Sequence, residues 1–285
     1  MFDRLYFSQK VKQLQYALGL SEREARIELE LLYAHATGLK KLDWLLDSKL
    51  LDEIDSIFAF ERLYQRRLQG EPIPYITGLA GFHSLVFQVS RDVLVPRQET
   101  ETLLDVFLER GGGAGAKKLI DLGTGSGIIA ISALIENQEL SVFATDKSDK
   151  AIEIAKKNAN FHRINMSNIE FGVGSWFKPV TGAHDFILAN PPYLSVHDEH
   201  LSDPALAFEP RMALVSDQNG LADIAHIIRE SPNFLRKDGW LCVEHGNEQA
   251  ESVRNLLANS GFRYIFTEDD INGQPRVSGG RMGHI

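Results

Sequence analysis

The chain has 285 residues, of which 44% are apolar and 24% charged, a composition typical of a folded protein and not of a disordered or fibrous one. The formal net charge is −9, and residues 1–75 contain 11 Lys/Arg against 12 Asp/Glu, so nearly all of the excess negative charge lies in residues 76–285. Since proteins bind a phosphate backbone through Lys and Arg, this balance disfavours nucleic acid as a partner.

Two further global features bear on location and metal content. No stretch is apolar over secretory or membrane-spanning length, and Cys242 is the only cysteine, so an intramolecular disulfide is impossible. His197 and His200, the closest pair of histidines, lie in the polar run "SVHDEHLSD", which is typical of a solvated loop rather than of a metal site. We therefore expect a cytoplasmic protein without a membrane segment or a metal ion.

The first 70 or so residues have the periodicity of helices. Ser21 and Glu24 have the spacing of a capping box, and Gly38 is suited to end the helix that they begin. Between them, apolar residues recur at helical intervals: Ala25, Leu29 and Leu32. We expect this stripe to form the core of a small helical domain.

A second apolar stripe follows and predicts another helix, with Leu51, Ile54, Phe58 and Leu63 as its core residues. Three arginines lie near its end: Arg62, Arg66 and Arg67. They are either a solvated helix terminus or a positive cluster that meets an acidic surface of a partner. The sequence leaves both interpretations open.

The pattern changes at Gly70. The stretch "GEPIPYITGLAGFHSLVFQVSRDVLVP" combines Gly and Pro with alternating apolar residues, which predicts a β-hairpin or short sheet between two domains. We expect a helical domain over residues 1–75, a hairpin linker over 76–95 and a larger domain over 96–285.

Strand-like and helix-like segments alternate after the glycines at 111–113. Helices are predicted over Lys150–Asn160 and Leu221–Leu235. Such alternation is typical of parallel βαβ units with helices on both faces of one sheet. The predicted strands are Lys118–Leu122, Ser141–Asp146, Ile169–Val173, Asp185–Ala189, Trp240–Glu244 and Phe262–Thr267.

A glycine-rich turn follows the first of these strands, in "LIDLGTGSGIIAISAL". Gly123, Gly125 and Gly127 allow a sharp turn and a close approach of the backbone to a ligand at the N-terminus of the next helix. A dinucleotide fingerprint needs G-x-G-x-x-G, whereas Ile128 occupies the place of its third glycine. A ligand without a pyrophosphate is therefore favoured.

Asp146 ends the second strand, 23 residues after Gly123. At that distance an acidic side chain can accept hydrogen bonds from ribose hydroxyls, so we expect a nucleoside site. Trp176, in "GSWF" after the third strand, either covers an adenine ring in this site or belongs to the core.

The fourth strand runs into an unusual segment, "ILANPPYL", residues 187–194. Pro191 and Pro192 end the strand, because proline cannot donate a hydrogen bond to the sheet, and they fix the path of the following loop. This loop leaves the carboxyl edge of the sheet, where ligands of open α/β sheets bind. Pro-Pro alone is a common strand terminator, but beside a nucleoside site we interpret it as part of an active site.

These motifs together resemble a known family. "DLGTGSG" with Asp146 resembles the S-adenosylmethionine site of class I methyltransferases, and "NPPY" resembles the signature of those that methylate a planar nitrogen. The closer resemblance is to the peptide chain release factor glutamine N5-methyltransferases, the HemK/PrmC family. Further segments carry it along nearly the whole chain: "GEPIPYITGLAGFHSLVFQV", "VLVPRQETETLL", "FEPRMAL", "EHGNEQ" and "GQPRV".

The resemblance implies a fold and a reaction. The fold is a Rossmann-like, seven-stranded α/β methyltransferase domain with a small N-terminal helical domain that recognises the substrate. The reaction transfers a methyl group from S-adenosyl-L-methionine to the side-chain amide of the glutamine in the Gly-Gly-Gln motif of release factors, and leaves S-adenosyl-L-homocysteine. The donor is expected to contact Gly123, Thr124, Gly125, Ser126, Gly127, Asp146, Trp176 and Asn190.

The chemistry of an amide acceptor explains the roles expected of NPPY. An amide nitrogen is a weak nucleophile, so transfer depends on its alignment with the S–CH3 bond. The Asn190 side-chain oxygen and the Pro191 carbonyl are expected to accept hydrogen bonds from the NH2 group, while Tyr193 packs against the amide plane. Asn190, Pro191 and Tyr193 are thus the expected catalytic residues, and Pro192 completes the substrate site.

Two positions depart from the family pattern. Gln98 replaces the second proline of Pro-Arg-Pro-Glu-Thr-Glu, which can loosen the loop near the active site. Ser175 stands where an acidic residue often precedes Trp-Phe, which weakens the adenine assignment. The alternatives to release factors are a glutamine of ribosomal protein L3, which "PRQETE" disfavours, and an adenine-N6-type nucleic-acid substrate, which the acidic charge disfavours.

Overall fold

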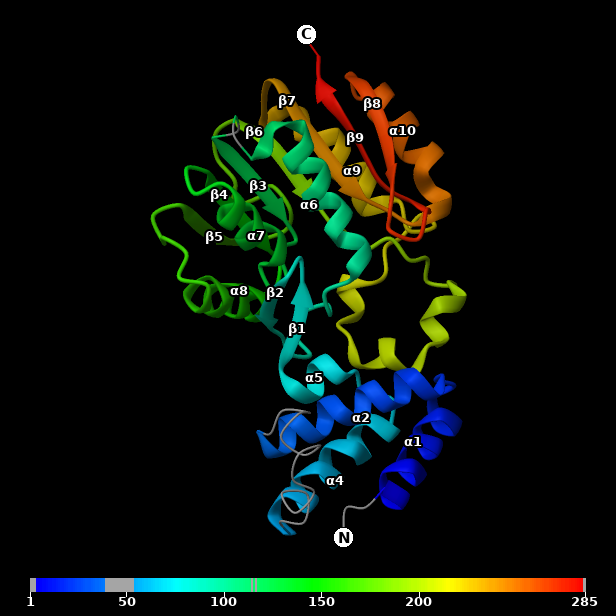
Figure 1. Cartoon of the computed structure of the whole chain (residues 1–285). Helices are drawn as coiled ribbons and strands as arrows, with labels where there is room; N and C mark the ends of the chain where they lie inside the picture. Colours follow the sequence, from blue (N-terminus) through cyan, green and yellow to red (C-terminus); the bar gives the residue numbers. More distant parts are fainter. Residues whose placement is uncertain (1–3, 39–53, 114, 116, 284–285) are drawn as a thin grey trace. The chain divides into compact units, whose positions relative to one another are not determined.

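The computed structural model describes residues 4–38, 54–113, 115 and 117–283, and it divides the chain into two compact units (Figure 1). The first unit comprises Met1–Gly78 and Asp203–Phe208, and the second comprises Leu79–Ser202 and Glu209–Ile285. Each unit therefore consists of two separate segments, because the short segment Asp203–Phe208 of the first unit interrupts the second unit in sequence. Within the described ranges, no helix combines the length and the apolar character needed to cross a bilayer.

The first unit consists of helices, as predicted. Ser21 begins the second of them with a complete capping box: its hydroxyl accepts a hydrogen bond from the Glu24 N–H at 3.2 Å, and the Glu24 carboxylate accepts one from the Ser21 N–H at 2.8 Å. Gly38 ends it in the left-handed conformation, with φ of 72°. The helices are α1 (Arg4–Leu18), α2 (Glu22–Thr37), α4 (Ile54–Leu68) and α5 (Ile73–Thr77).

The core of this unit confirms the first predicted stripe and corrects the second. Ala25, Leu29 and Leu32 are fully buried. Leu63 is buried as well, but Phe58 is 73% exposed, because the buried face of α4 is the one that carries Phe60 and Tyr64. Leu51 and the side chain of Ile54 lie outside the described residues.

The segment after Gly70 contains the predicted hairpin, β1 (Leu79–Phe82) paired antiparallel with β2 (Leu85–Gln88). The residues just before it form the short helix α5 and not a strand. Pro72 precedes this helix and Pro74 lies in its first turn, where a missing N–H costs no hydrogen bond, and Gly78 ends it with φ of 75°. The prolines therefore mark a helix start here.

The second unit contains a seven-stranded sheet with the order β5-β4-β3-β6-β7-β9-β8. Neighbouring strands from β5 to β7 are parallel, and β9 is antiparallel to both β7 and β8. This confirms the predicted Rossmann-like α/β class. The strands are β3 (Lys118–Leu122), β4 (Ser141–Asp146), β5 (Ile169–Val173), β6 (His184–Ala189), β7 (Leu235–Glu244), β8 (Phe262–Asp269) and β9 (Pro275–Met282).

Two segments differ from the strand-by-strand expectation. The residue pattern alone did not predict β9, which contains Pro275, Gly279 and Gly280, residues of low strand propensity. A Cβ at Gly279 would lie 2.5 Å from the Leu241 carbonyl oxygen, so close packing against β7 requires glycine there. The predicted helix over Leu221–Leu235 is too long: α9 (Ala222–Glu230) ends before a single 3-10 turn, and Leu235 already belongs to β7.

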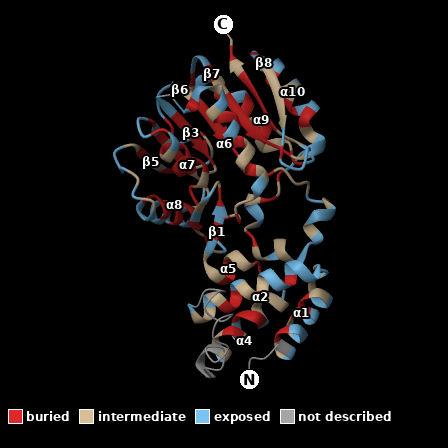
Figure 2. Cartoon of the chain, viewed as in Figure 1, coloured by how far each residue is buried: buried red, intermediate tan, exposed pale blue. Residues whose placement is uncertain are grey.

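Helices cover both faces of the sheet, and most strand residues are buried (Figure 2). One apolar cluster contains residues of α6, α7 and α8, and the other contains residues of α9 and α10. Strand residues alternate between them: Leu188 belongs to the first cluster, whereas Ile187 and Ala189 belong to the second. The remaining helices are α6 (Glu101–Phe107), α7 (Ile128–Glu136), α8 (Asp149–Phe161) and α10 (Ala250–Asn259), with short 3-10 or π turns at 98–100, 108–112, 199–202, 204–208, 211–213, 231–233 and 247–249.

The strand order reverses between β3 and β6. From β3 the chain adds β4 and β5 on one side, and then returns to place β6 on the other side, where Leu122 is paired with Ala189. Such a switch point opens a crevice at the carboxyl ends of the strands. The glycine-rich turn after β3 and the segment Asn190–Tyr193 after β6 therefore leave the sheet side by side.

Candidate active site

The glycine-rich turn has the left-handed backbone that its sequence predicts. Gly123, Gly125 and Gly127 have φ of 73°, 55° and 85°. The N–H groups of Gly123 and Thr124 both donate to the Thr145 carbonyl at 2.8 Å, which ties the turn to the end of β4. A side chain on Gly123 would begin 3.3 Å from the Trp176 ring, so glycine keeps this space open.

A buried carboxylate on β3 holds the glycine-rich turn through hydrogen bonds. Asp121, on β3, accepts hydrogen bonds from the Thr124 hydroxyl at 2.7 Å and from the Ala130 N–H at 3.2 Å. Its other oxygen has no hydrogen-bond partner among the described residues, and burial raises the pKa of Asp121 to about 7. Asp121 thus fixes the turn to the N-terminus of α7 and lies outside the cavity lining.

Asp146 lies at the end of β4, on the other side of the turn. One of its oxygens accepts a hydrogen bond from the Gly125 N–H at 3.0 Å, and the other accepts one from the Ser148 N–H at 2.8 Å. Burial raises the pKa of Asp146, while these N–H groups lower it. A carboxylate so placed can hold the loop and still present lone pairs to hydroxyl groups of a ligand.

Trp176 forms part of the cavity wall and also packs against an apolar cluster of the sheet. Its indole N–H donates to Asp223 at 3.2 Å, and its carbonyl accepts a hydrogen bond from the Thr145 hydroxyl at 3.2 Å. The residue adopts a left-handed backbone, with φ of 47°. Trp176 both lines the cavity and packs against the core of the sheet, so a role in covering an adenine ring and a role in the core are compatible.

The segment after β6 is held from several sides. The Asn190 amide nitrogen donates to the Thr100 hydroxyl at 3.0 Å, and Pro191 and Pro192 are buried. The Tyr193 hydroxyl donates to Glu244 at 3.4 Å, and the Tyr193 carbonyl accepts a hydrogen bond from the Gln249 side chain at 3.0 Å. The loop is thus anchored before and after the two prolines.

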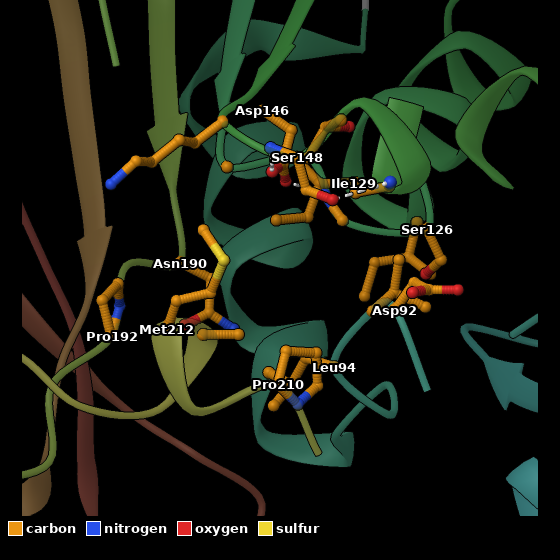
Figure 3. Close-up of a pocket in the computed structure, with 18 of the residues that line it drawn as sticks. Asp92, Leu94, Ser126, Ile129, Asp146, Ser148, Asn190, Pro192, Pro210 and Met212 are labelled. Atoms are coloured by element: carbon orange, nitrogen blue, oxygen red, sulfur yellow. Dashed lines mark hydrogen bonds between the residues drawn. The ribbon is translucent and has the colours of Figure 1, made fainter. Parts of the chain in front are cut away.

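These segments surround one cavity of about 310 Å³ in the second unit. Figure 3 shows Asp146, Ser126 and Asn190, from three separate segments, around this cavity. The lining includes most of the residues expected at the site: Gly123, Thr124, Gly125, Ser126, Asp146, Trp176, Asn190 and Pro192. The lining does not include Gly127, Pro191 or Tyr193; Gly127 instead begins α7, where a Cβ would lie 2.9 Å from the Ile131 side chain.

Several residues of the site were not singled out from the sequence. Arg97 lines the cavity and forms an ion pair with Glu209, whose side chain is 1% exposed and also accepts a hydrogen bond from the Val95 N–H at 3.2 Å. Thr100 and Glu244 contact Asn190 and Tyr193. The segments "PRQETE", "FEPRMAL" and "EHGNEQ" contain them all, so the resemblance pointed to the right segments without identifying these side chains.

Within the part of the chain that the structure describes, no cluster of three or more His, Cys, Asp or Glu side chains is arranged to hold a metal ion. His197 and His200 are both exposed, and the His200 ring lies 2.7 Å from the Asp198 carboxylate.

Comparisons with known proteins agree with this geometry. Residues 12–78 match the PrmC N-terminal domain family, and residues 98–207 match the methyltransferase small domain family. The release factor glutamine methyltransferase of Aliivibrio fischeri is 43% identical over 224 residues, 78% of each chain. The protein of the same name from Xylella fastidiosa strain 9a5c is 36% identical over 262 residues, which cover 92% of this chain and 94% of that one.

A solved structure supports the fold independently. A methyltransferase from Pyrococcus furiosus superimposes with a TM-score of 0.54 at 17% identity, over 80% of this chain and all of the other. At that identity the likeness concerns the fold alone. The sequence relatives, which exceed 30% identity over most of the chain, go further, and this chain belongs to the release factor glutamine methyltransferase family.

Proposed function

We propose that this chain transfers the methyl group of S-adenosyl-L-methionine to the side-chain amide nitrogen of a glutamine in a peptide chain release factor, at its Gly-Gly-Gln motif. One observation carries the proposal: Asn190 and Asp146 line the same cavity, so a group for the acceptor and a group for the donor lie within one site. Family membership supports the choice of glutamine and of release factors.

The cavity fits the adenosyl part of the donor. Because Gly123 has no side chain, the space next to the Trp176 ring stays open, and a Cβ at this position would fill it. Asp146 offers carboxylate lone pairs for ribose hydroxyls, and the Trp176 ring offers a flat apolar surface for adenine. When bound, S-adenosyl-L-methionine supplies an electrophilic methyl group on a sulfonium centre, and S-adenosyl-L-homocysteine remains after transfer.

Asn190 and its neighbours act on the acceptor. The Asn190 nitrogen is engaged by Thr100, which leaves the side-chain oxygen to accept a hydrogen bond from the glutamine NH2 group. The Pro191 carbonyl is the second acceptor in our proposal, and Tyr193 packs against the amide plane. This alignment lowers the barrier by up to roughly 7–11 kcal/mol.

Atoms and charges balance in this reaction. The nitrogen lone pair of the glutamine amide forms the new N–C bond while the S–C bond breaks and its electron pair stays on sulfur. The methylated amide then loses one N–H proton to solvent. Asn190 stabilises the positive charge that develops on nitrogen, because its oxygen carries partial negative charge.

Asn190→Ala tests the proposal. We expect transfer to fall by at least about 100-fold, as for loss of an oriented group that acts in the transition state, with donor affinity nearly unchanged. The measurement is incorporation of labelled methyl into purified release factor, with calorimetry of donor binding. Asn160→Ala, at an exposed position in α8, is the matched control. Near-wild-type turnover of Asn190→Ala would refute the role of Asn190 in orienting the acceptor amide.

The same assay distinguishes the acceptors. Release factor, ribosomal protein L3 and duplex or single-stranded nucleic acid are offered separately to the wild-type chain with labelled donor. We expect label in release factor, at the glutamine of Gly-Gly-Gln, and a release factor with Gln replaced by Glu at that position remains unlabelled. The cytoplasm is the compartment that we propose, in keeping with the buried free thiol of Cys242.

A further inference from the structure

The β-hairpin formed by β1 and β2 belongs to the second unit, and β2 lies against α8 (Figure 1). Two of its side chains, Phe82 and Phe87, are buried in the apolar cluster that contains residues of α6, α7 and α8. The two-stranded sheet pairs β2 with β1 along one edge. The N–H and C=O groups on the other edge of β2 therefore need partners outside the sheet.

Two side chains at the C-terminal end of α8 supply these partners. The Asn158 side-chain oxygen accepts a hydrogen bond from the Gln88 N–H at 2.7 Å, and the Asn158 side-chain nitrogen donates to the Gln88 carbonyl at 2.9 Å. One side-chain amide thus pairs with both backbone groups of one residue, as a neighbouring strand does. Four residues later, Nε2 of His162 donates to the Val86 carbonyl at 2.9 Å, since a carbonyl can only accept.

Asn158 also holds the glycine-rich turn. Its side-chain nitrogen donates a second hydrogen bond, to the Ser126 carbonyl at 2.8 Å. Asn158 is 0% exposed, and both N–H donors of its amide are used. Ser126 lines the cavity that we assign to the donor. One buried side chain therefore connects the hairpin with the turn at the donor site.

The residues that follow β2 form part of the wall of the same cavity. Asp92, Val93 and Leu94 line it, and Figure 3 shows Asp92 and Leu94 at the cavity together with Ser126. The Asp92 carboxylate also accepts a hydrogen bond at 3.2 Å from Lys150, in the first turn of α8. Separation of β2 from α8 would therefore displace this wall as well as remove the hairpin from Asn158.

We propose that the hairpin belongs to the donor site, and that Asn158 is the positioning residue that couples the contact between β2 and α8 to donor binding. The inference rests on the proposed function, because it requires S-adenosyl-L-methionine in this cavity. A donor that contacts both the turn and the wall stabilises the contact of β2 with α8. This contact in turn strengthens donor binding by the same factor. A hairpin that only joins the two units has no such linkage.

Hydrogen exchange of the Gln88 amide measures the contact of β2 with α8, because this N–H donates to Asn158. In the wild type, we expect S-adenosyl-L-methionine at about 100 times its Kd to slow this exchange by up to about 100-fold, since the ligand favours the state that binds it. Amides of β8, an edge strand whose residues lie outside the cavity lining, are the control and should change much less. An exchange rate of Gln88 that does not respond to the donor would overturn the inference.

His162→Phe separates the hairpin from the turn, because His162 bonds to β2 and lies outside the cavity lining. Phenylalanine keeps an aromatic ring next to Phe87, whose ring centroid lies 4.8 Å from that of His162, but it cannot donate to the Val86 carbonyl. We expect Gln88 to exchange about two- to tenfold faster without donor, the effect of one lost hydrogen bond, and the donor to slow it again. A wild-type exchange rate in this variant would contradict the proposed contact.

Asn158→Asp tests the coupling itself. It keeps the shape and the acceptor for the Gln88 N–H, but it replaces the NH2 group by an oxygen, so at most one of the two donated hydrogen bonds can remain. We expect about tenfold faster exchange of Gln88 and about a tenfold higher Kd for the donor, measured by titration calorimetry. Asn160→Asp, the same substitution at an exposed position of α8, is the matched control and should behave like the wild type.

Wild-type donor affinity in Asn158→Asp would overturn the inference. If this variant does not fold, the exchange of Gln88 in the wild type and in His162→Phe decides by the criteria above. The proposed function fails by a different result, namely a donor that binds Asp146→Ala as tightly as the wild type. Weaker binding to Asp146→Ala, together with an exchange rate of Gln88 that the donor does not change, would leave the proposed function in place and refute the inference alone.

Discussion

Asp146 combines two tasks in one carboxylate. It accepts hydrogen bonds from the Gly125 and Ser148 N–H groups, and so it fixes the turn, while the same side chain lines the cavity. In our proposal, a replacement that removes the carboxylate therefore loosens the loop and leaves the ribose hydroxyls of the donor without an acceptor.

We expect Asp146→Ala to weaken binding of S-adenosylmethionine by about 1–3 kcal/mol, the usual cost of polar groups left without partners. Titration calorimetry at constant pH measures this loss. Asp149→Ala, an exposed carboxylate in the first turn of α8, should bind the donor like the wild type. Unchanged affinity of Asp146→Ala would remove Asp146 from the donor site.

At the scale of an element, the glycine-rich turn joins β3 to α7, and two of its three glycines have different surroundings. Around Gly125 a Cβ would meet no atom closer than 4.0 Å, and Gly125 lines the cavity. Around Gly127 a Cβ would lie 2.9 Å from the Ile131 side chain and 3.2 Å from that of Ala155, on α8. Gly125 leaves room for a ligand, whereas Gly127 allows α7 and α8 to pack closely.

Replacing each glycine by alanine should therefore affect a different property, stability for Gly127 and donor binding for Gly125. Gly127→Ala should lower the free energy of unfolding by about 2–4 kcal/mol, because overpacking adds to the cost of a left-handed alanine. Gly125→Ala should lose only about 1–2 kcal/mol of stability and yet bind the donor much more weakly. Thermal unfolding and donor titration of both variants test this; equal stability losses would contradict the assignment.

The elements also show what the sequence can predict. Local patterns suffice for β3, β4 and β5, whose bounds agree with the predicted ones, and for the capping box at Ser21. They fail where distant segments decide the structure: β9 is stabilised by pairing with both β7 and β8 despite its glycines, and Phe58 is exposed because α4 buries another face.

In the candidate site, too, local sequence patterns predict some residues, whereas others depend on contacts between distant segments. Ser126 and Asn190 follow strands, Asp146 ends one, and each lies in a recognisable motif, so the sequence places them at one edge of the sheet. The ion pair of Arg97 with Glu209 joins residues far apart in the chain, and the contact of Thr100 with Asn190 does the same. No local spacing encodes such contacts, and only the fold brings them together.

At the scale of the whole molecule, the arginines of α4 need a new interpretation. Arg66 pairs with Glu71, and Arg67 pairs with Glu28 on α2 through two hydrogen bonds of 2.7 and 2.9 Å. Both ion pairs lie within the first unit, so the positive cluster, one of the two interpretations left open by the sequence, is reduced to the exposed Arg62. We propose that the first unit recognises the release factor by its folded surface rather than by a cluster of arginines.

Arg67→Ala tests this role in the intact chain. The side chains of Arg67 and Glu28 are only 11% and 19% exposed, so loss of the pair should destabilise the first unit by about 2–4 kcal/mol. Donor affinity should not change, because the whole cavity lining belongs to the second unit. Methylation of intact release factor should fall more than methylation of a short Gly-Gly-Gln peptide, measured above the temperature at which the first unit of the variant unfolds.

Arg62→Ala, on the same helix but exposed, serves as the control and should resemble the wild type in stability. Equal losses on the protein and on the peptide substrate would show that the first unit only supports the fold.

The segment Asp203–Phe208 has a consequence for the order of events during synthesis. It belongs to the first unit although it lies deep within the sequence of the second, and a Cβ at Gly70 would lie 3.2 Å from the Pro204 side chain. The N-terminal helices leave the ribosome early, but they must wait for most of the sheet to be translated before this last piece arrives. The ribosome thus delivers strands β3 to β6 before the last segment of the smaller unit.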